Sequence, residues 1–412
     1  MDRKYSQDWE SQVAVRKFLG NKIRMVSAFC CGSLLFIITG WMNLHGADDN
    51  PPSTIRTVST EVRREYHRSN DRALFLGARA CLDCHRSEFA SWLSTEHFNN
   101  TVNRFELNKD TIAKRYFEKH GSLDRCYQCH TAPKEQRFGR KFVETGTSCE
   151  SCHGASGGEG GWLNRHAVYG PNTTRLEQET SQHFQSRIDF CDQAGMIRPG
   201  RQYLMAKQCM SCHLIGDPEL ISEEIGHPVG FDKFELIPYL SGEVRHNFHL
   251  NQRNNAKAPT LDTLRRGLSP TQRQRVYMIV EQLARMEVAF NYLANLQNEE
   301  AFENRYADDL IGIVEDGADF LDEYVEVLLE PDDSDVPPLN EEAVESLTIV
   351  LDEFEKFDDL DEPTRAAAAD SARVISKAAN QFMAALGNGS KLEALDVFFE
   401  DTGNPVGDVL QP

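Results

Sequence analysis

"GTSCESCHG", residues 146–154, places two cysteines three positions apart, with a histidine directly after the second cysteine. Such a Cys-x-x-Cys-His motif could bind a metal ion, close a disulfide or attach a larger group such as a haem. The chain contains this motif four times, and the repetition separates the alternatives. The four copies are CLDCH (Cys81, Cys84, His85), CYQCH (Cys126, Cys129, His130), CESCH (Cys149, Cys152, His153) and CMSCH (Cys209, Cys212, His213).

The regularity of these motifs favours covalent haem attachment over the other uses of paired cysteines. Chance would give on the order of 0.01 such pentapeptides in a chain of this composition. Two thiols on one helical turn can each bond a vinyl group of a haem, and the next histidine then faces the iron. Zinc sites need no histidine after every second cysteine, and a redox pair would be expected once, beside a βαβ pattern. We therefore predict four haems c, held by the eight cysteines, with the four motif histidines as proximal iron ligands.

Each predicted haem iron needs something on its second face, and nine further histidines are present. His97 follows the first motif in a stretch where we expect Trp92 to pack on a macrocycle and His97 to leave the same helix. The predicted distal ligands are His97, His166 after a glycine-rich loop, His227 in a turn-like setting, and His246, which lies three residues before His249. The sequence leaves open whether His67, His120 and His183 are ligands or ordinary surface or core residues. We expect Cys191, Met205 and Met210 to be buried.

These motifs give residues 78–250 a resemblance to the tetrahaem cytochrome c-554 family and related multihaem cytochromes. The matching stretches are CLDCHRSEFASWLSTEH, GTSCESCHG followed by His166, and CMSCHLIGDPELISEEIGHPVGF with EVRHNF downstream. The resemblance implies a mostly helical, loop-rich domain whose haems pass electrons along a chain. It also implies that distal ligands often serve a haem other than the nearest in sequence. Members of that family can contain a haem with an open axial face, and the number of histidines does not decide whether this chain does.

The N-terminus has the pattern of a membrane signal. Residues 1–24 carry six bases against three acids, and residues 25–44 carry no formal charge. About 20 apolar residues span a bilayer, whereas a cleaved signal has a core of about 7 to 15. The pattern favours an anchor at residues 25–44 over a cleaved signal. With the positive flank in the cytoplasm, the rest of the chain would be periplasmic or otherwise extracytoplasmic.

The formal charge of −20 is unevenly distributed along the chain. Residues 299–412 hold 31 acids against 6 bases, whereas residues 1–298 have a small positive excess. No basic stripe with interleaved aromatic residues is present, which argues against a nucleic-acid partner. Ser269 and Pro270 predict a helix start, and the apolar residues that follow recur at helical spacing: Val276, Ile279, Val280, Leu283, Met286 and Phe290. Further helices are predicted at 298–329, 340–360 and 363–386, and we interpret their carboxylates as a solvated face.

The predicted fold is mainly α, with a loop-rich multihaem cytochrome c domain followed by an acidic helical bundle. The predicted boundaries are 1–47 for the basic tail with its anchor or signal, 48–76 for a linker, 77–258 for the tetrahaem domain and 259–412 for the bundle. We expect an electron carrier that acts between redox partner proteins, with no catalytic residue assigned. The alternative is an oxidoreductase that converts a small nitrogen or sulfur compound at one haem with an open axial face. The oligomeric state is not indicated.

Overall fold

The structure is a computed structural model, and its contacts divide the chain into two compact units, Met1–Thr54 and Ile55–Pro412. All described residues lie in the second unit. They are residues 75–99, 111–135, 141–144, 146–158, 160–171, 173, 178–230, 235–241, 270–331, 335–386 and 392–401. The predicted anchor at 25–44 lies outside these ranges. Within them, no helix is both long enough and apolar enough to cross a membrane.

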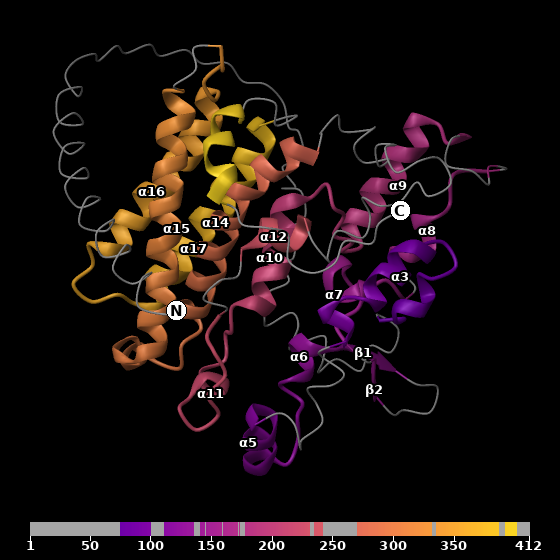
Figure 1. The fold of residues 1–412 in the computed structure, drawn as a ribbon, viewed down its shortest axis with the longest axis horizontal. Helices are drawn as coiled ribbons and strands as arrows, with labels where there is room; N and C mark the ends of the chain where they lie inside the picture. Colours follow the sequence, from indigo (N-terminus) through magenta and orange to yellow (C-terminus); the bar gives the residue numbers. More distant parts are fainter. Residues whose placement is uncertain are drawn as a thin grey trace, which may run out of the picture. The chain divides into compact units, whose positions relative to one another are not determined.

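The segment that contains the four motifs consists of short elements joined by loops (Figure 1). Its elements are η2 (Ala78–Ala80), α3 (Arg86–Leu93), α5 (Thr111–His120), α6 (Tyr127–His130), β1 (Ala132–Glu135), β2 (Lys141–Glu144), α7 (Cys149–His153), α8 (Leu163–His166), α9 (Ser181–Gln193), α10 (Gln202–His213), α11 (Pro218–Ile221) and α12 (Leu236–Ser241). β1 and β2 form an antiparallel hairpin in which Ala132 pairs with Glu144 and Glu135 with Lys141. The prediction of a mainly helical, loop-rich segment is confirmed.

Longer helices follow and pack side by side as a bundle (Figure 1). They are α14 (Pro270–Ala294), α15 (Arg305–Leu329), α16 (Glu341–Asp358) and α17 (Arg365–Leu386), with the 3-10 helices η4 (Glu299–Glu303) and η5 (Glu393–Asp401). Asn304 and Asn340 cap α15 and α16, since their side-chain oxygens accept from backbone amides at 3.1 and 2.8 Å. Thr364 caps α17 in the same way at 3.1 Å. All four predicted helices are therefore present, but the stretch predicted as one helix at 298–329 is divided into η4 and α15.

The bundle core is built from one apolar stripe on each helix. The six apolar residues predicted to share a face of α14 are all buried. Full burial of such a side chain contributes roughly 1.5–3 kcal/mol, so this stripe is a large part of what holds the bundle together. α15 approaches α14 closely at Gly317, where a Cβ atom would lie 2.7 Å from Met286 Cγ. A larger residue at this position would push the two helices apart.

The bundle also encloses α10, the helix that carries the fourth motif. Tyr203, Ala206 and Met210 of α10 belong to the same buried cluster as α14, and Met205 is buried as well. Tyr306 of α15 donates its hydroxyl to the Ile215 carbonyl at 3.0 Å, just after the motif. The fourth motif is thus packed against the bundle core. The domain boundaries at 76 and 258 stay predictions.

Candidate haem sites

Each Cys-x-x-Cys-His motif forms a helical turn that ends at its histidine. His130, His153 and His213 are the last residues of α6, α7 and α10. In the first motif the His85 amide donates to the Cys81 carbonyl at 2.9 Å, which is the i to i−4 bond of an α-helix. Residues four apart share a helix face, so the first cysteine and the histidine of each motif lie on the same side. Covalent attachment and proximal ligation of one haem require this arrangement.

The third motif is bounded by specific backbone signals at both ends of α7. Ser148 and Ser151 form a capping box at its start, in which the Ser148 amide donates to Ser151 Oγ at 3.1 Å. Gly154 follows His153 with φ at 85°, and a Cβ atom there would lie 2.4 Å from the Gly195 carbonyl oxygen. Only glycine fits this position, which explains why α7 ends at the histidine.

A buried carboxylate inside the third motif joins it to the first. Glu150 is 2% exposed and accepts from the Gly77 amide at 2.6 Å and the Leu76 amide at 3.1 Å. It also accepts from the Ser156 amide at 2.8 Å and the Ser156 hydroxyl at 2.5 Å. Gly77 directly precedes η2, which leads into the first motif. This role of Glu150 was not predicted from the sequence, although its position between the two cysteines of the motif could have suggested it.

Three pairs of histidine rings face one another within the described residues. The distances between ring centres are 5.9 Å for His85 and His166, 6.1 Å for His97 and His213, and 6.4 Å for His130 and His227. Each pair joins a motif histidine to a predicted distal ligand. His97, His166 and His227 each lie beside a motif that is not their nearest in sequence, as the resemblance implied.

These separations test whether the residues fit a haem. Two metal–nitrogen bonds of about 2 Å, plus roughly 1 Å from each ring centre to its nitrogen, sum to about 6 Å. Ordinary aromatic pairs also fall within about 4.5–7 Å, so the spacing alone is not decisive. However, each of the three pairs combines the histidine of a Cys-x-x-Cys-His motif with a histidine from a distant segment. The residues therefore fit c-type haem with an imidazole on each face of the iron.

Hydrogen bonds to backbone carbonyls fix the tautomer of two of these imidazoles. His153 Nδ1 lies 2.7 Å from the Ile197 carbonyl oxygen, and His227 Nδ1 lies 2.8 Å from that of Pro228. A carbonyl oxygen can only accept, so Nδ1 carries a proton in both rings, and Nε2 is the ring nitrogen that could bind a metal. Metal-binding histidines commonly have this tautomer and this kind of supporting bond.

Burial favours the neutral form of three of these rings, whereas a hydrogen bond with Glu88 raises the pKa of His85. Burial lowers the pKa of His97, and burial together with the charge of His85 lowers the pKa of His166 to about 4. Burial, followed by the charges of His97 and His130, lowers the pKa of His213 to about 3. Neutral imidazole is the form that binds metal, so these environments favour ligation at physiological pH.

The remaining candidate histidines divide into two groups. His120 Nε2 lies 3.0 Å from Glu219, and His183 Nδ1 lies 2.8 Å from Glu179, so both pair with carboxylates. These contacts support an ordinary structural role for them. His67 and the predicted ligand His246 lie outside the described residues, and the assignment of His246 stays a prediction.

The segment before the third motif positions His97. α3 ends at Leu93, so the expectation that His97 leaves the same helix as Trp92 was wrong. Instead, Trp92 Nε1 donates to the Thr147 carbonyl at 2.7 Å, and the Thr147 amide donates to the His97 carbonyl at 3.0 Å. Thr147 therefore holds both the end of α3 and the backbone of His97, a long-range contact that helical periodicity does not reveal.

The cysteine thiols show which motifs are neighbours. No described cysteine takes part in a disulfide, and Cys191 is buried as expected. A hydrogen bond with Cys81 raises the pKa of Cys149, which brings the first and third motifs together. Burial, followed by the charge of Cys152, raises the pKa of Cys209, so the third and fourth motifs are also neighbours.

Comparison with known proteins agrees with this geometry. Residues 80–154, which hold the first three motifs, match the family described as "Cytochrome c554 and c-prime". The cytochrome c-554 of Nitrosomonas europaea is 25% identical over 156 residues, which cover 34% of this chain and 58% of that protein. The chain thus matches somewhat more than half of that relative's length, and no solved structure matches the chain. Residues 80–154 of the chain are therefore similar to the cytochrome c554 and c-prime family.

Proposed function

We propose that this chain is an exported tetrahaem c-type cytochrome that relays electrons between redox partner proteins. The observation that carries the proposal is the set of three histidine ring pairs. An iron with an imidazole on both faces has no position left for a substrate, which suits electron transfer. The match of residues 80–154 to the cytochrome c554 and c-prime family supports c-type haem and an electron-transfer role. The number four rests on the four motifs.

Each proposed site residue has one of three roles. The eight motif cysteines attach the haems, and His85, His130, His153 and His213 are the proximal ligands. His97, His166, His227 and His246 are the proposed distal ligands. When bound, haem c supplies one-electron cycling between Fe(III) and Fe(II). The chain brings both imidazoles of each pair close together, and burial favours the neutral form of His97, His166 and His213.

The contacts between motifs support one order of electron transfer. The first and third motifs are linked by Cys81 and Cys149, and the third and fourth by Cys152 and Cys209. The charge of His130, in the second motif, acts on His213 of the fourth. The order that follows is first, third, fourth, second. Electrons would therefore enter and leave at the first and second motifs.

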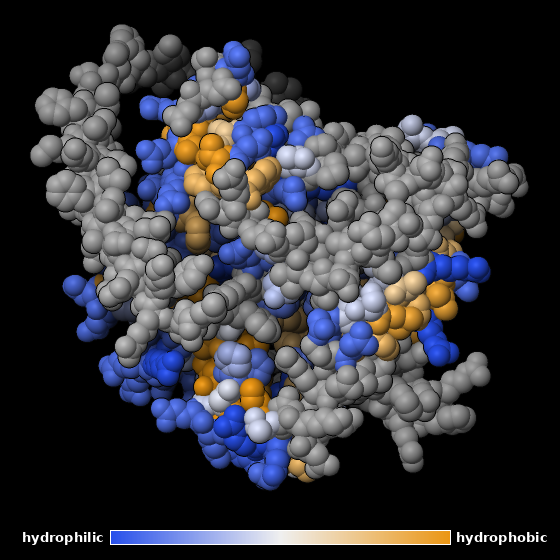
Figure 2. Space-filling view, viewed as in Figure 1, coloured by the Kyte–Doolittle hydropathy of each residue, from blue (hydrophilic) through white to orange (hydrophobic). Residues whose placement is uncertain are grey.

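We propose that the acidic bundle guides a positively charged redox partner to the haems. Figure 2 shows hydrophilic side chains along the outer edge of the bundle, where residues 299–412 concentrate the negative charge. Burial, followed by the charges of Asp358, Asp316 and Asp319, raises the pKa of Glu315 on α15, as expected for a surface crowded with carboxylates. Attraction of this kind is screened by salt, so the rate of electron transfer to a basic partner should fall as ionic strength rises. c-type cytochromes are extracytoplasmic, and the anchor at residues 25–44 is part of this proposal.

An absorption spectrum separates the carrier from the oxidoreductase alternative. The purified protein would be quantified for covalent haem per chain, then reduced with and without carbon monoxide. The proposal expects four haems and, at low ionic strength, no prompt carbon monoxide shift. The ring pairs involve the first, second and fourth motifs, so the two functions differ chiefly at His153 in the third. A spectral shift equal to that of one haem would indicate an iron with an open axial face. It would favour the alternative function, an oxidoreductase that converts a small nitrogen or sulfur compound.

A further inference from the structure

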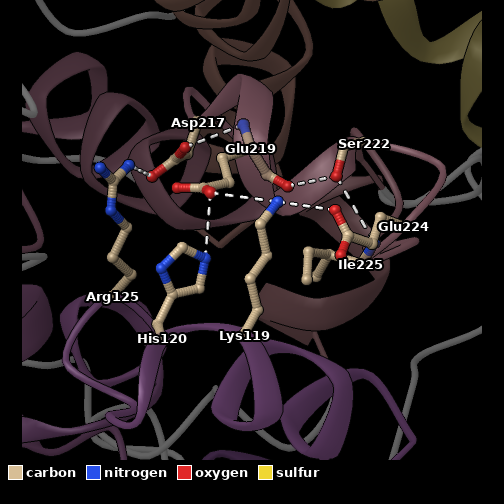
Figure 3. Close-up of polar contacts among 8 residues, drawn as sticks. All are labelled: Lys119, His120, Arg125, Asp217, Glu219, Ser222, Glu224 and Ile225. Carbon is tan, nitrogen blue, oxygen red and sulfur yellow. Dashed lines mark hydrogen bonds and ion pairs between the residues drawn. The ribbon is translucent and has the colours of Figure 1, made fainter.

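A cluster of charged side chains joins two segments that carry the ring pair of the second motif. We call this cluster the clasp; its residues are Lys119, His120, Arg125, Asp217, Glu219 and Glu224 (Figure 3). The basic members come from the segment of α5 and α6 that ends at His130. The acidic members come from the loop around α11 that ends at His227. In Figure 3 the basic side chains point across the gap toward the acidic ones.

The clasp contains several ion pairs of good geometry. Lys119 Nζ lies 2.7 Å from Glu224 and 3.5 Å from Glu219, so this ammonium group bridges two acids. His120 Nε2 lies 3.0 Å from Glu219. Arg125, which directly precedes Cys126 of the second motif, pairs with Asp217. Each of the three basic residues thus contacts the α11 loop.

Hydrogen bonds within the acidic loop connect the clasp residues to His227. Asp217 caps α11 by accepting from the Glu219 amide at 3.1 Å, and the His227 amide donates to the Leu220 carbonyl at 2.9 Å. Ile225 is fully buried in a small cluster that includes Tyr116 of α5. The loop therefore behaves as a short, internally bonded unit. Its position relative to α5 depends on this small apolar cluster and on the clasp.

The first motif's distal ligand is supported differently, by a buried ion pair. The backbone carbonyl of His166 accepts from Arg187, which makes a two-pronged ion pair with Glu179. The side chains of Arg187 and Glu179 are 6% and 0% exposed. In the clasp, by contrast, Lys119 is 36% and Glu224 63% exposed. Salt screens exposed pairs far more strongly than buried ones, so the strength with which the clasp holds His227 should fall as ionic strength rises.

We propose that Glu219 and Glu224 are positioning residues that hold His227 opposite His130. Loss or screening of the clasp then frees His227 and opens one face of the second haem to small ligands. This inference rests on the proposed function, because it requires haem at the second motif. It adds that ionic strength controls whether His227 binds the second haem.

The test compares carbon monoxide binding by full-length haem-loaded variants. Glu219→Gln combined with Glu224→Gln removes the acidic partners of Lys119 and His120 but leaves the Asp217 cap intact. The control is Glu223→Gln, an exposed acid of the same loop. His227→Ala provides the reference spectrum for an open second haem. We expect the double variant to bind carbon monoxide at one additional haem with the reference spectrum. Its rate should be about 5- to 30-fold above wild type, the effect of losing a few exposed ion pairs.

A second measurement uses wild-type protein alone and does not depend on the variant's folding. Raising sodium chloride shortens the Debye length from about 30 Å at 0.01 M to about 3 Å at 1 M. The rate of carbon monoxide binding should rise with salt in wild type, and His227→Ala should remove that dependence. Wild-type protein without covalent haem would refute the proposed function itself. A different result is that the protein carries its haems while neither the double variant nor high salt speeds carbon monoxide binding. That result would refute the role of the clasp and leave the proposed function standing.

Discussion

Replacing Glu150 with glutamine should lower the free energy of unfolding by about 3 kcal/mol. Glu150 is a buried acid on which four donors converge, from Leu76, Gly77 and Ser156. Glutamine has nearly the same shape, so the substitution removes one acceptor atom and the negative charge without opening a cavity. It therefore isolates the electrostatic part of the link between the first and third motifs.

The magnitude follows from counting what each donor loses. With the glutamine NH₂ group facing Gly77, one hydrogen bond is lost and a buried amide is left unsatisfied, at about 2 kcal/mol. The three remaining bonds lose the assistance of a charge, at about 1 kcal/mol each. Glutamine avoids the desolvation of a buried carboxylate, which offsets about 2 kcal/mol. The opposite side-chain orientation would face three donors instead of one and would be less stable still.

The assay is guanidinium unfolding of the haem-loaded protein, followed by circular dichroism at neutral pH. Glu345→Gln is the matched control, because Glu345 is an exposed acid on α16. Such a surface change should alter stability by no more than about 0.5 kcal/mol. A loss for Glu150→Gln that is as small as that of the control would refute the argument. It would mean that the donors around Glu150 find other partners, so that this carboxylate does not hold the two motifs together.

Two further predictions concern other buried charges. Arg187→Met should leave the Glu179 carboxylate buried without its main partner, costing about 3 kcal/mol or more, and should release the backbone of His166. A reduced carbon monoxide difference spectrum should then show one newly open haem, whereas an unchanged spectrum would argue against this support. Burial raises the pKa of Glu281 on α14 to about 7, against an ordinary value near 4.5. The folded state therefore holds this proton to higher pH than the unfolded state. The contribution of Glu281 to stability is full below about pH 4.5 and falls by about 3 kcal/mol as pH rises through 7. Glu281→Gln keeps one acceptor oxygen, for either Arg285 or the Leu236 amide, and should flatten this part of the stability profile. An unchanged slope in guanidinium unfolding between pH 4 and 8 would contradict the assignment.

Short sequence patterns predicted the helices, the motif turns and the candidate distal histidines. The helix start at Pro270 and the cap before α17 follow from short-range preferences, and the structure has both. The motif turns follow from the spacing of cysteine and histidine. The distal candidates His97, His166 and His227 were chosen from their setting, and each lies in a ring pair.

Contacts between distant segments were not predictable in this way. Nothing near His97 indicates that it faces His213, because that pairing depends on how loops of unrelated sequence return to one another. The role of Glu150 was missed for the same reason, since its donors include Gly77, far away in the chain. Met210 of α10 was expected to be buried, but nothing in the sequence indicated that it packs in the core of the bundle.

α10 packs against the bundle, and this packing limits when a haem can be attached to the fourth motif. Attachment of a haem to Cys209 requires the thiol to be reachable and the surroundings to admit a large planar molecule. In the finished fold α10 packs against α14, and Cys209 is partly buried. The helices from 270 to 386 follow the fourth motif in the chain and are made after it. For the haem proposed at the fourth motif, we therefore expect attachment before α14 packs against α10, so that the folded bundle then restricts access to it.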